Sequence, residues 1–177
     1  MKKQSFISKL FISITISSGA IWFGSYISKL FTIYNLFEPK DLTLKASFEY
    51  ESIGYILAEL LPVFVTPFTA YTVMILFFLL AVSVSKVNIK KEGWLFILIM
   101  LVLITLPFEI YLMLIDYRVI SSLLSNSYNN EYILELLRDR ITSLSGFPII
   151  LLLCYLSIIF LIVFKPLAAK VNLKNEN

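Results

Sequence analysis

The amino-acid sequence predicts an all-α integral membrane protein, a bundle of four transmembrane helices with both termini in the cytoplasm. Three observations lead to this fold class: the composition, the lengths of four apolar segments and the placement of the lysines. Of 177 residues, 59% are hydrophobic and only 15% are charged, whereas about a quarter of the residues in a soluble domain are charged. No soluble fold of this size buries so much apolar surface, so lipid must be the solvent for much of the chain.

Four apolar segments are each long enough to cross a bilayer as a helix. A helix needs roughly 20 residues to span a hydrocarbon core of about 30 Å. Continuous apolar runs such as ILIMLVLIT exclude the alternation of a barrel strand. We expect one membrane domain, 1–177, with transmembrane helices over about 10–37, 53–84, 94–115 and 146–164, external loops over about 38–52 and 116–145, and a cytoplasmic loop over about 85–93.

The lysines orient the predicted helices. Nine of them lie before the first helix, between the second and third, or after the fourth: Lys2, Lys3, Lys9, Lys86, Lys90, Lys91, Lys165, Lys170 and Lys174. Only two acids, Glu92 and Glu176, share that side, whereas all three arginines lie on the other. By the positive-inside rule, both termini and the middle loop face the cytoplasm. We therefore expect an integral protein of a bacterial inner membrane.

The first external loop contains an alternating segment, DLTLKASFEYE, over 41–51. Leu44, Phe48 and Tyr50 fall on one side of an extended chain, with polar and charged residues on the other, which is the pattern of a half-buried strand. One interpretation is a short extended segment that lies on the bilayer surface or over the helix bundle. The other is a strand that pairs with another protein through these three residues.

The second external loop predicts a short amphipathic helix within NNEYILELLRDRITSL. Asn130 is a candidate N-cap for a helix that starts one residue later. Ile133 and Leu137, followed by Ile141 and Leu144, recur at helical spacing, with charged residues elsewhere on the wheel. Such a helix lies in the outer interface of the membrane. Its apolar face, with Ile133 and Leu137, either covers the bundle as a lid or contacts a partner.

Glu109 is unusual because it lies within an apolar segment that begins at Trp94. At about 1.5 Å per helical residue, Glu109 lies roughly 22 Å above the inner boundary, in the outer half of the hydrocarbon core. Lys29, counted along the first helix in the same way, lies roughly 27 Å up. An intramembrane carboxylate is costly unless it is paired, protonated or hydrated. We therefore expect Lys29 and Glu109 to form an ion pair if their helices are neighbours.

Two further charges and three prolines lie near this position. By the same count, Glu59 and Arg118 lie roughly 36–37 Å from the inner face, in the outer interfacial zone. Pro62, Pro67 and Pro107 each remove a backbone donor, so they are candidate kinks that expose freed carbonyls. One interpretation of the cluster is a buried ion pair that fixes helix register. The other is an outward-facing polar vestibule that binds a proton, a cation or a lipid headgroup.

Several chemistries have no residues to support them. Histidine is absent, which removes His-ligated haem, zinc or copper and any His general base. Cys154 is the single cysteine, so no intramolecular disulfide can form. The sequence has no nucleotide-binding loop, cysteine cluster or catalytic Ser/His arrangement. We therefore expect no catalytic residue, no metal, no cofactor and no nucleic-acid partner.

The sequence thus favours a small non-enzymatic protein that serves as an accessory or assembly subunit of a larger membrane complex. Its expected partners are membrane lipid and either other membrane subunits or further copies of the same chain. The alternative is a small transporter or channel subunit with an outward-facing site around Glu109. That alternative requires an oligomer, because four helices rarely enclose a pathway alone.

Overall fold

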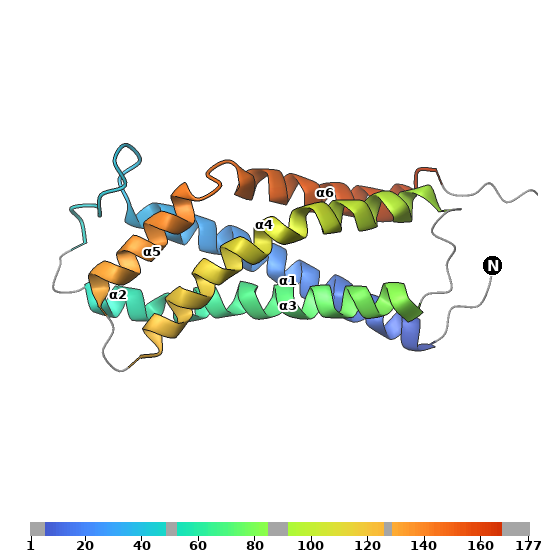
Figure 1. Ribbon diagram of the computed structural model, residues 1–177, viewed down its shortest axis with the longest axis horizontal. Coiled ribbons are helices and arrows are strands. Elements are labelled where there is room, and N and C mark those ends of the chain that lie inside the picture. The colour runs from blue at the N-terminus through green and yellow to red at the C-terminus, as the bar shows by residue number, and fades with distance from the viewer. Residues whose placement is uncertain (1–5, 49–52, 85–91, 126–128, 168–177) are drawn as a thin grey trace, which may run out of the picture. The chain divides into compact units, whose positions relative to one another are not determined.

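The computed structural model describes residues 6–48, 53–84, 92–125 and 129–167. Within these ranges the regular secondary structure is entirely helical (Figure 1), as the sequence predicts. The helices described are α1 (Phe6–Leu36), α2 (Ile53–Glu59), α3 (Leu61–Val84), α4 (Gly93–Leu123), α5 (Asn130–Thr142) and α6 (Phe147–Phe164).

Four stretches are long and apolar enough to cross a membrane, judged by length and composition: Phe6–Leu36, Ile53–Val84, Gly93–Leu123 and Phe147–Phe164. This confirms four candidate membrane helices among the described residues and supports an integral membrane protein. The third stretch runs to Leu123, beyond the Ile115 at which the sequence placed its end. Polar residues alone do not end a helix, because its hydrogen bonds are interrupted by proline or by strongly unfavourable residues.

The second stretch is divided into α2 and α3 at Leu60. The Leu60 amide donates to the Leu57 oxygen at 3.0 Å, and the Phe64 amide donates to the Leu60 oxygen at 3.1 Å. Pro62 lies in the first turn of α3, where its missing N–H is tolerated. Pro67 and Pro107 lie inside α3 and α4, and both helices continue through them. Kinks at these two prolines stay predictions.

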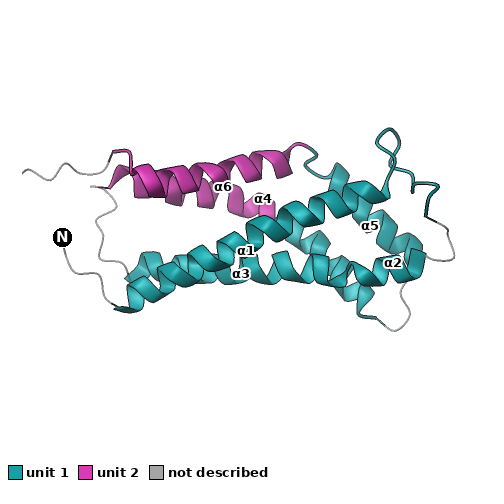
Figure 2. Ribbon diagram, turned by 180° about the vertical axis from the view of Figure 1, so that it is seen from behind, with its two compact units in different colours: residues 1–85, 110–145 teal, residues 86–109, 146–177 magenta. Residues whose placement is uncertain are grey.

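Contacts divide the chain into two compact units (Figure 2). Among the described residues, unit 1 comprises those within 6–84 and 110–145, and unit 2 comprises 92–109 and 146–167. Helix α4 contributes to both, because the boundary falls between Glu109 and Ile110. Unit 1 holds α1, α2, α3 and α5 with the second part of α4, whereas unit 2 holds α6 with the first part of α4.

Helices α1 and α3 pack along each other in unit 1 (Figure 1, Figure 2). From Ser18 onward, the buried residues of α1 recur every three or four positions, which places them on one face. They are Ser18, Trp22, Tyr26, Lys29, Ile33 and Leu36. The ring of Trp22 lies 5.1 Å from that of Tyr26 and 5.4 Å from that of Tyr71. A Cβ atom at Gly19 would lie 3.2 Å from the Met74 sulfur, so this small residue permits a close approach.

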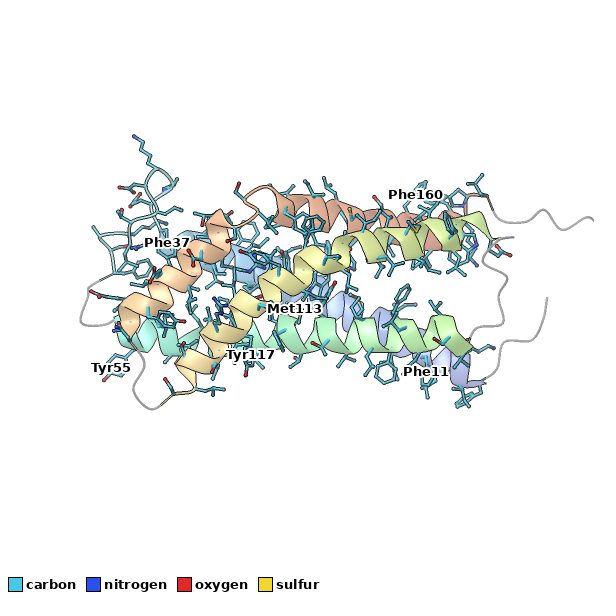
Figure 3. The ribbon with its side chains drawn as sticks, in the orientation of Figure 1. Phe11, Phe37, Tyr55, Met113, Tyr117 and Phe160 are labelled. Carbon is cyan, nitrogen blue, oxygen red and sulfur yellow. The ribbon has the colours of Figure 1, made fainter. Side chains whose placement is uncertain are left out.

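An apolar core forms in unit 1 where α2 and α5 meet the ends of α1 and α3. Its members come from five helices and the residues beside them: Ile33, Leu36, Phe37, Ile53, Leu57, Leu60, Phe64, Val119, Ile133, Leu134, Leu136, Leu137 and Ile141. Phe37 lies near α5, whereas Tyr55 of α2 projects away from the helices and is 82% exposed (Figure 3). Helix α5 is therefore anchored to unit 1 by most of its apolar side chains.

The bounds of α5 correct two details of the sequence prediction. The N-cap is Asn129 rather than Asn130, because the Asn129 side chain accepts a hydrogen bond from the Glu131 amide at 2.8 Å. Asn129 has the extended backbone (φ −93°, ψ 117°) that an N-cap requires, whereas Asn130 is already helical. Leu144 does not continue the apolar face, because the helix ends at Thr142 and Leu144 has a left-handed backbone with φ 57°.

The described part of the alternating segment does not form a regular strand. Its pairing is a single antiparallel bridge between Phe37 and Leu44, and the chain then turns so that the Phe48 amide donates to the Lys45 oxygen at 3.0 Å. Leu42 has a left-handed backbone with φ 53°, which interrupts the period-two geometry of a strand. Leu42, Leu44 and Phe48 instead pack against the apolar core of unit 1. Tyr50 lies outside the described residues.

Within unit 2, both ends of α6 contact α4. Phe147 at the start of α6 stacks on Phe108 of α4 with ring centroids 4.6 Å apart. Beyond the other end, the Leu167 oxygen accepts a hydrogen bond from the Gly93 amide at 3.2 Å. A Cβ atom at Gly93 would lie 2.9 Å from the Leu167 Cβ, so only glycine allows this approach. The Lys165 ammonium lies 5.7 Å from the centre of the Trp94 ring.

Candidate functional site

Three charged side chains meet inside unit 1, one from each of three helices. Lys29 of α1 donates from Nζ to Asp116 Oδ2 of α4 at 2.5 Å. Arg140 of α5 donates from Nε to the other oxygen, Oδ1, at 3.0 Å. Each of the three side chains is 1% exposed. One carboxylate thus joins α1, α4 and α5, and we call these three residues the buried charge cluster.

The position of each charge follows from helical periodicity. Lys29 is three residues after Tyr26 and four before Ile33, on the buried face of α1. Asp116 lies between Leu112 and Val119, which are both fully buried on α4. Arg140 comes three residues after the buried Leu137 of α5. Because residues three or four apart share a helix face, each charge faces the interior of unit 1 with its apolar neighbours.

Aromatic rings surround the two cations. The Tyr26 hydroxyl accepts a long hydrogen bond from Arg140 Nη2 at 3.5 Å. The Lys29 ammonium lies 5.1 Å from the centre of the Tyr26 ring and 5.6 Å from that of Phe64. The Arg140 guanidinium lies 5.8 Å from the Tyr26 ring. These ring faces attract cations, and they also exclude the water that would otherwise solvate them.

The contribution of such a cluster to stability is seen mainly as the free energy lost when one of its members is removed. Transferring ions from water into an apolar interior costs several kcal/mol each, and their mutual attraction offsets this only when the geometry is good. Removing one partner from a buried pair destabilises a protein by about 3–5 kcal/mol, because a charge is left buried without compensation. The cluster therefore fixes the rotation and height of three helices relative to one another.

Glu109 is also buried, with a side chain that is 1% exposed on α4. In the structure, Lys29 forms an ion pair with Asp116, which lies seven residues after Glu109 on α4. Sequence reasoning missed Asp116 because it placed this residue in an external loop, after an end of the helix at Ile115. The expected pairing of Lys29 with Glu109 stays a prediction.

Arg140 was also missed, although the sequence carries a signal for it. Position 140 lies three residues after Leu137 and seven after Ile133, within the stripe that sequence reasoning assigned to the apolar face. A charge on such a stripe has to meet a counter-charge inside the protein. The other two charges named from the sequence, Glu59 of α2 and Arg118 of α4, are both exposed. Their location in the outer interface of a membrane stays a prediction.

A cleft opens between the segment 38–48 and α5, also in unit 1. Its volume is about 620 Å³, and its lining residues are Leu44, Lys45, Ala46, Phe48, Glu131, Leu134, Glu135 and Arg138. Leu44 and Phe48 were expected to contact a partner, and both border this cleft. Ile133 and Leu137 were expected to do the same, but both are completely buried in the apolar core. Other residues of α5 therefore line the cleft.

The two cations of the cleft are held by the chain itself. Lys45 Nζ donates to Asn35 Oδ1 at 3.0 Å. Arg138 Nε donates to the Leu42 oxygen at 3.0 Å, and its guanidinium lies 5.7 Å from the centre of the Phe37 ring. These contacts attach the segment 38–48 to α1 and to α5.

Asp41, at the start of the turn that leads to the cleft, has a lowered pKa. The Thr43 hydroxyl donates to Asp41 Oδ1 at 2.9 Å, and the Thr43 amide donates to the same atom at 3.3 Å. Both hydrogen bonds favour the ionised carboxylate, and the hydroxyl contributes most to lowering the pKa of Asp41 below 3.8. Elsewhere in the described ranges, no group of three His, Cys, Asp or Glu side chains is placed to hold a metal ion.

The fold and these two sites define a class, an integral membrane protein of four candidate spans with a buried charge cluster and a surface cleft. Comparisons of the chain with models of protein families, with curated proteins and with solved structures find no match. A functional proposal therefore rests on the geometry of the two sites.

Proposed function

We propose that the protein is a non-enzymatic accessory or assembly subunit of a larger membrane complex. In this proposal it lies in a bacterial inner membrane with both termini in the cytoplasm, as the lysines favour. The segment 38–48 and α5 then lie on the outer side, where they contact another membrane subunit.

The buried charge cluster carries this proposal. A transport site needs charged groups that can exchange a bound ion or proton with water. Lys29, Asp116 and Arg140 are instead bonded to one another, and each is 1% exposed. Charges in this arrangement position helices, so they support a structural role for unit 1.

The surface cleft also supports an accessory role. It combines apolar side chains with charges of both signs, and it is built on a segment and a helix that are themselves firmly attached to unit 1. A preformed surface loses little conformational freedom when a partner binds. An accessory subunit requires such a surface.

The experiment that tests this proposal is extraction of the tagged protein in a mild detergent, with identification and quantification of whatever accompanies it. We expect a second membrane protein at a fixed ratio. Ala46→Trp, which fills the cleft, should lose the second protein, whereas the matched control Ser47→Trp, on the adjacent exposed residue that does not line the cleft, should keep it. A clean homo-oligomer with no second protein would contradict the accessory role.

A second candidate function is a small oligomeric transporter or channel subunit. One observation favours it: Glu109 is a buried carboxylate on α4, two residues after Pro107. Charged residues inside membrane spans often mark ion or proton pathways. In this case the site around Glu109 would bind a proton, a cation or a lipid headgroup.

The two functions differ in what Glu109→Gln does. A transport role predicts that proton or alkali-cation flux in proteoliposomes is abolished, while the amount of protein in the membrane stays the same. Asp139→Asn is the control, because it removes an exposed carboxylate of α5 that is no part of this site. If the wild-type chain carries no flux, or if Glu109→Gln leaves flux unchanged, the transport role is excluded.

A further inference from the structure

Arg118 of α4 is an exposed cation in a part of unit 1 that has few other charges. Helix α3 contains no charged residue, and the part of α4 in unit 1 contains a single acid, Asp116, which is buried and bound by Lys29 and Arg140. Arg118 forms no hydrogen bond or ion pair with any other described residue. Its guanidinium is therefore available to an anion, and no acid on these two helices competes for it.

The exposed face of α4 that leads to Arg118 is apolar. Leu114 and Tyr111 lie four and seven residues before Arg118, on the same face of the helix, and are 55% and 50% exposed. Tyr117, next to Arg118, is 58% exposed. Because α4 forms a candidate membrane span over Gly93–Leu123, we expect lipid acyl chains to contact these side chains. A lipid molecule is therefore the ligand that this face fits.

The height of Arg118 along α4 matches that of lipid headgroups. At about 1.5 Å per helical residue, Arg118 lies roughly 36 Å from Trp94. A bilayer has a hydrocarbon core of about 30 Å and is about 40–45 Å thick with its headgroups, so we expect Arg118 among the phosphates. Tyrosine is enriched at the same level of membrane proteins. The ring of Tyr117 (Figure 3) lies 6.5 Å from that of Phe68 on α3, which positions it one residue from the guanidinium.

We propose that Arg118 binds the phosphate of a phospholipid whose acyl chain lies along Leu114 and Tyr111. A planar guanidinium donates two parallel hydrogen bonds to phosphate oxygens, which makes arginine well suited to this ligand. The bound lipid fixes the depth of α4 in the bilayer. This inference goes beyond the proposed function, because it requires no partner subunit and does not involve the cleft.

The test is photo-crosslinking of lipid to the full chain in a mild detergent. Ser121→p-benzoylphenylalanine places the photoreactive group on an exposed position one turn after Arg118. The probes are dioleoylphosphatidylglycerol and dioleoylglycerol, which have the same acyl chains and differ in the phosphate headgroup. The mass of the adduct identifies the lipid, and a titration gives the concentration at half-saturation. We expect this concentration to be at least about tenfold lower for the phospholipid, because a hydrogen bond to a charged group is lost without the phosphate.

A pair of arginine variants assigns the binding to Arg118. In the same photoreactive background, Arg118→Gln should raise the half-saturating concentration of dioleoylphosphatidylglycerol by at least about tenfold. Arg138→Gln should leave it unchanged, because Arg138 is an exposed arginine on α5 that already donates to the Leu42 oxygen. Arg118→Lys keeps the charge without the planar fork, so its value should fall between those of the wild type and Arg118→Gln. Each variant is first shown to have the wild-type thermal midpoint, which excludes misfolding as the cause.

Three results would each overturn the inference. Equal crosslinking of the two lipids would show that only the acyl chains are bound. Equal titrations for Arg118→Gln and Arg138→Gln, or no lipid adduct at all, would show that Arg118 holds no phosphate. A protein adduct instead of a lipid adduct after irradiation of native membranes would show that this face of α4 contacts a protein.

Discussion

Arg138 and Arg140 are two residues apart on α5, but the structure gives them opposite surroundings. Arg140 is buried and shares Asp116 with Lys29, whereas Arg138 is exposed and donates to the backbone oxygen of Leu42. Two residues along a helix correspond to a rotation of roughly 200°. One arginine therefore faces the interior of unit 1, and the other faces the cleft.

This comparison separates charges that build the fold from charges that remain at its surface. Breaking a buried ion pair costs about 3–5 kcal/mol, whereas an exposed pair contributes about 0–1 kcal/mol. The buried charge cluster therefore acts on stability and helix arrangement. The exposed charges of the cleft contribute little to stability. The predictions below test this difference, from the largest expected effect to the smallest.

The largest effect is expected for Asp116→Ala. It leaves the ammonium of Lys29 and the guanidinium of Arg140 buried without the carboxylate that they share, so the free energy of unfolding should fall by about 3–5 kcal/mol. Thermal midpoints in detergent and the amount of protein in the membrane would show this. Asp139→Ala, which removes an exposed acid of α5, should change neither. Equal stability of the two variants would contradict a structural role for the cluster.

Apolar replacement of the whole cluster sharpens the same test. Changing Lys29 to Met, Asp116 to Leu and Arg140 to Met together removes every charge instead of stranding one. Well-packed apolar residues can replace a buried ion cluster with little loss of stability. The triple variant should therefore be more stable than Asp116→Ala alone, which the same thermal midpoints would measure.

A smaller effect is expected for Arg140→Met. Asp116 keeps its bond to Lys29, so the loss is mainly that of the hydrogen bond from Arg140 to the carboxylate, about 1.5–3 kcal/mol, because the bond to the Tyr26 hydroxyl is long. Arg138→Met should change the stability by less than about 1 kcal/mol, because this side chain is exposed. Equilibrium unfolding of both variants gives the comparison directly. If Arg138→Met were the more harmful change, the distinction between the two arginines would be wrong.

The next effect is expected at the start of α5, which presents both arginines. Asn129→Ala removes the side chain that accepts from the Glu131 amide, and loss of an N-cap costs about 1 kcal/mol. Asn130→Ala should be neutral, because Asn130 is the first residue of the helix and not its cap. Hydrogen exchange of the first turn of α5 should accelerate in Asn129→Ala and stay unchanged in Asn130→Ala.

The smallest effect is expected for Asp41→Asn, and it depends on pH. The folded protein holds the pKa of Asp41 below its ordinary value of 3.8, so ionised Asp41 contributes stability above that value. This contribution is lost as the pH falls from 3.8 through the lowered pKa of Asp41. The wild type should therefore be slightly more stable than Asp41→Asn at neutral pH, with a difference that disappears in acid. A constant difference between thermal midpoints at all pH values would contradict this assignment.

The sequence predicted more of the fold than of the site. Four candidate membrane helices were predicted, because long apolar segments indicate spans by composition alone. The division at Leu60 was not, although Pro62 was named as a place of irregular backbone. The alternation over 41–51 suggested a strand, but Leu42 adopts a left-handed backbone and the described part of the segment folds over the core of unit 1.

The site was harder to predict because it joins distant parts of the chain. Lys29 was named, but its partner Asp116 is 87 residues away and Arg140 is a further 24. Leu44 and Phe48, named as candidates for partner contact, border the cleft, whereas Ile133 and Leu137 are completely buried. Hydrophobic pattern identifies the buried face of a helix, but it does not distinguish burial within the chain from burial against a partner.

The sequence by itself determined the membrane environment and the four long apolar helices, because these depend on composition and on the length of each apolar segment. Only the tertiary structure decided which charges meet. A shift of one residue turns a side chain by roughly 100° and moves it about 1.5 Å along the helix. Lys29, Asp116 and Arg140 come from three helices, so their contact depends on three such rotations and heights being set together. Packing of whole helices sets them, and no local pattern does.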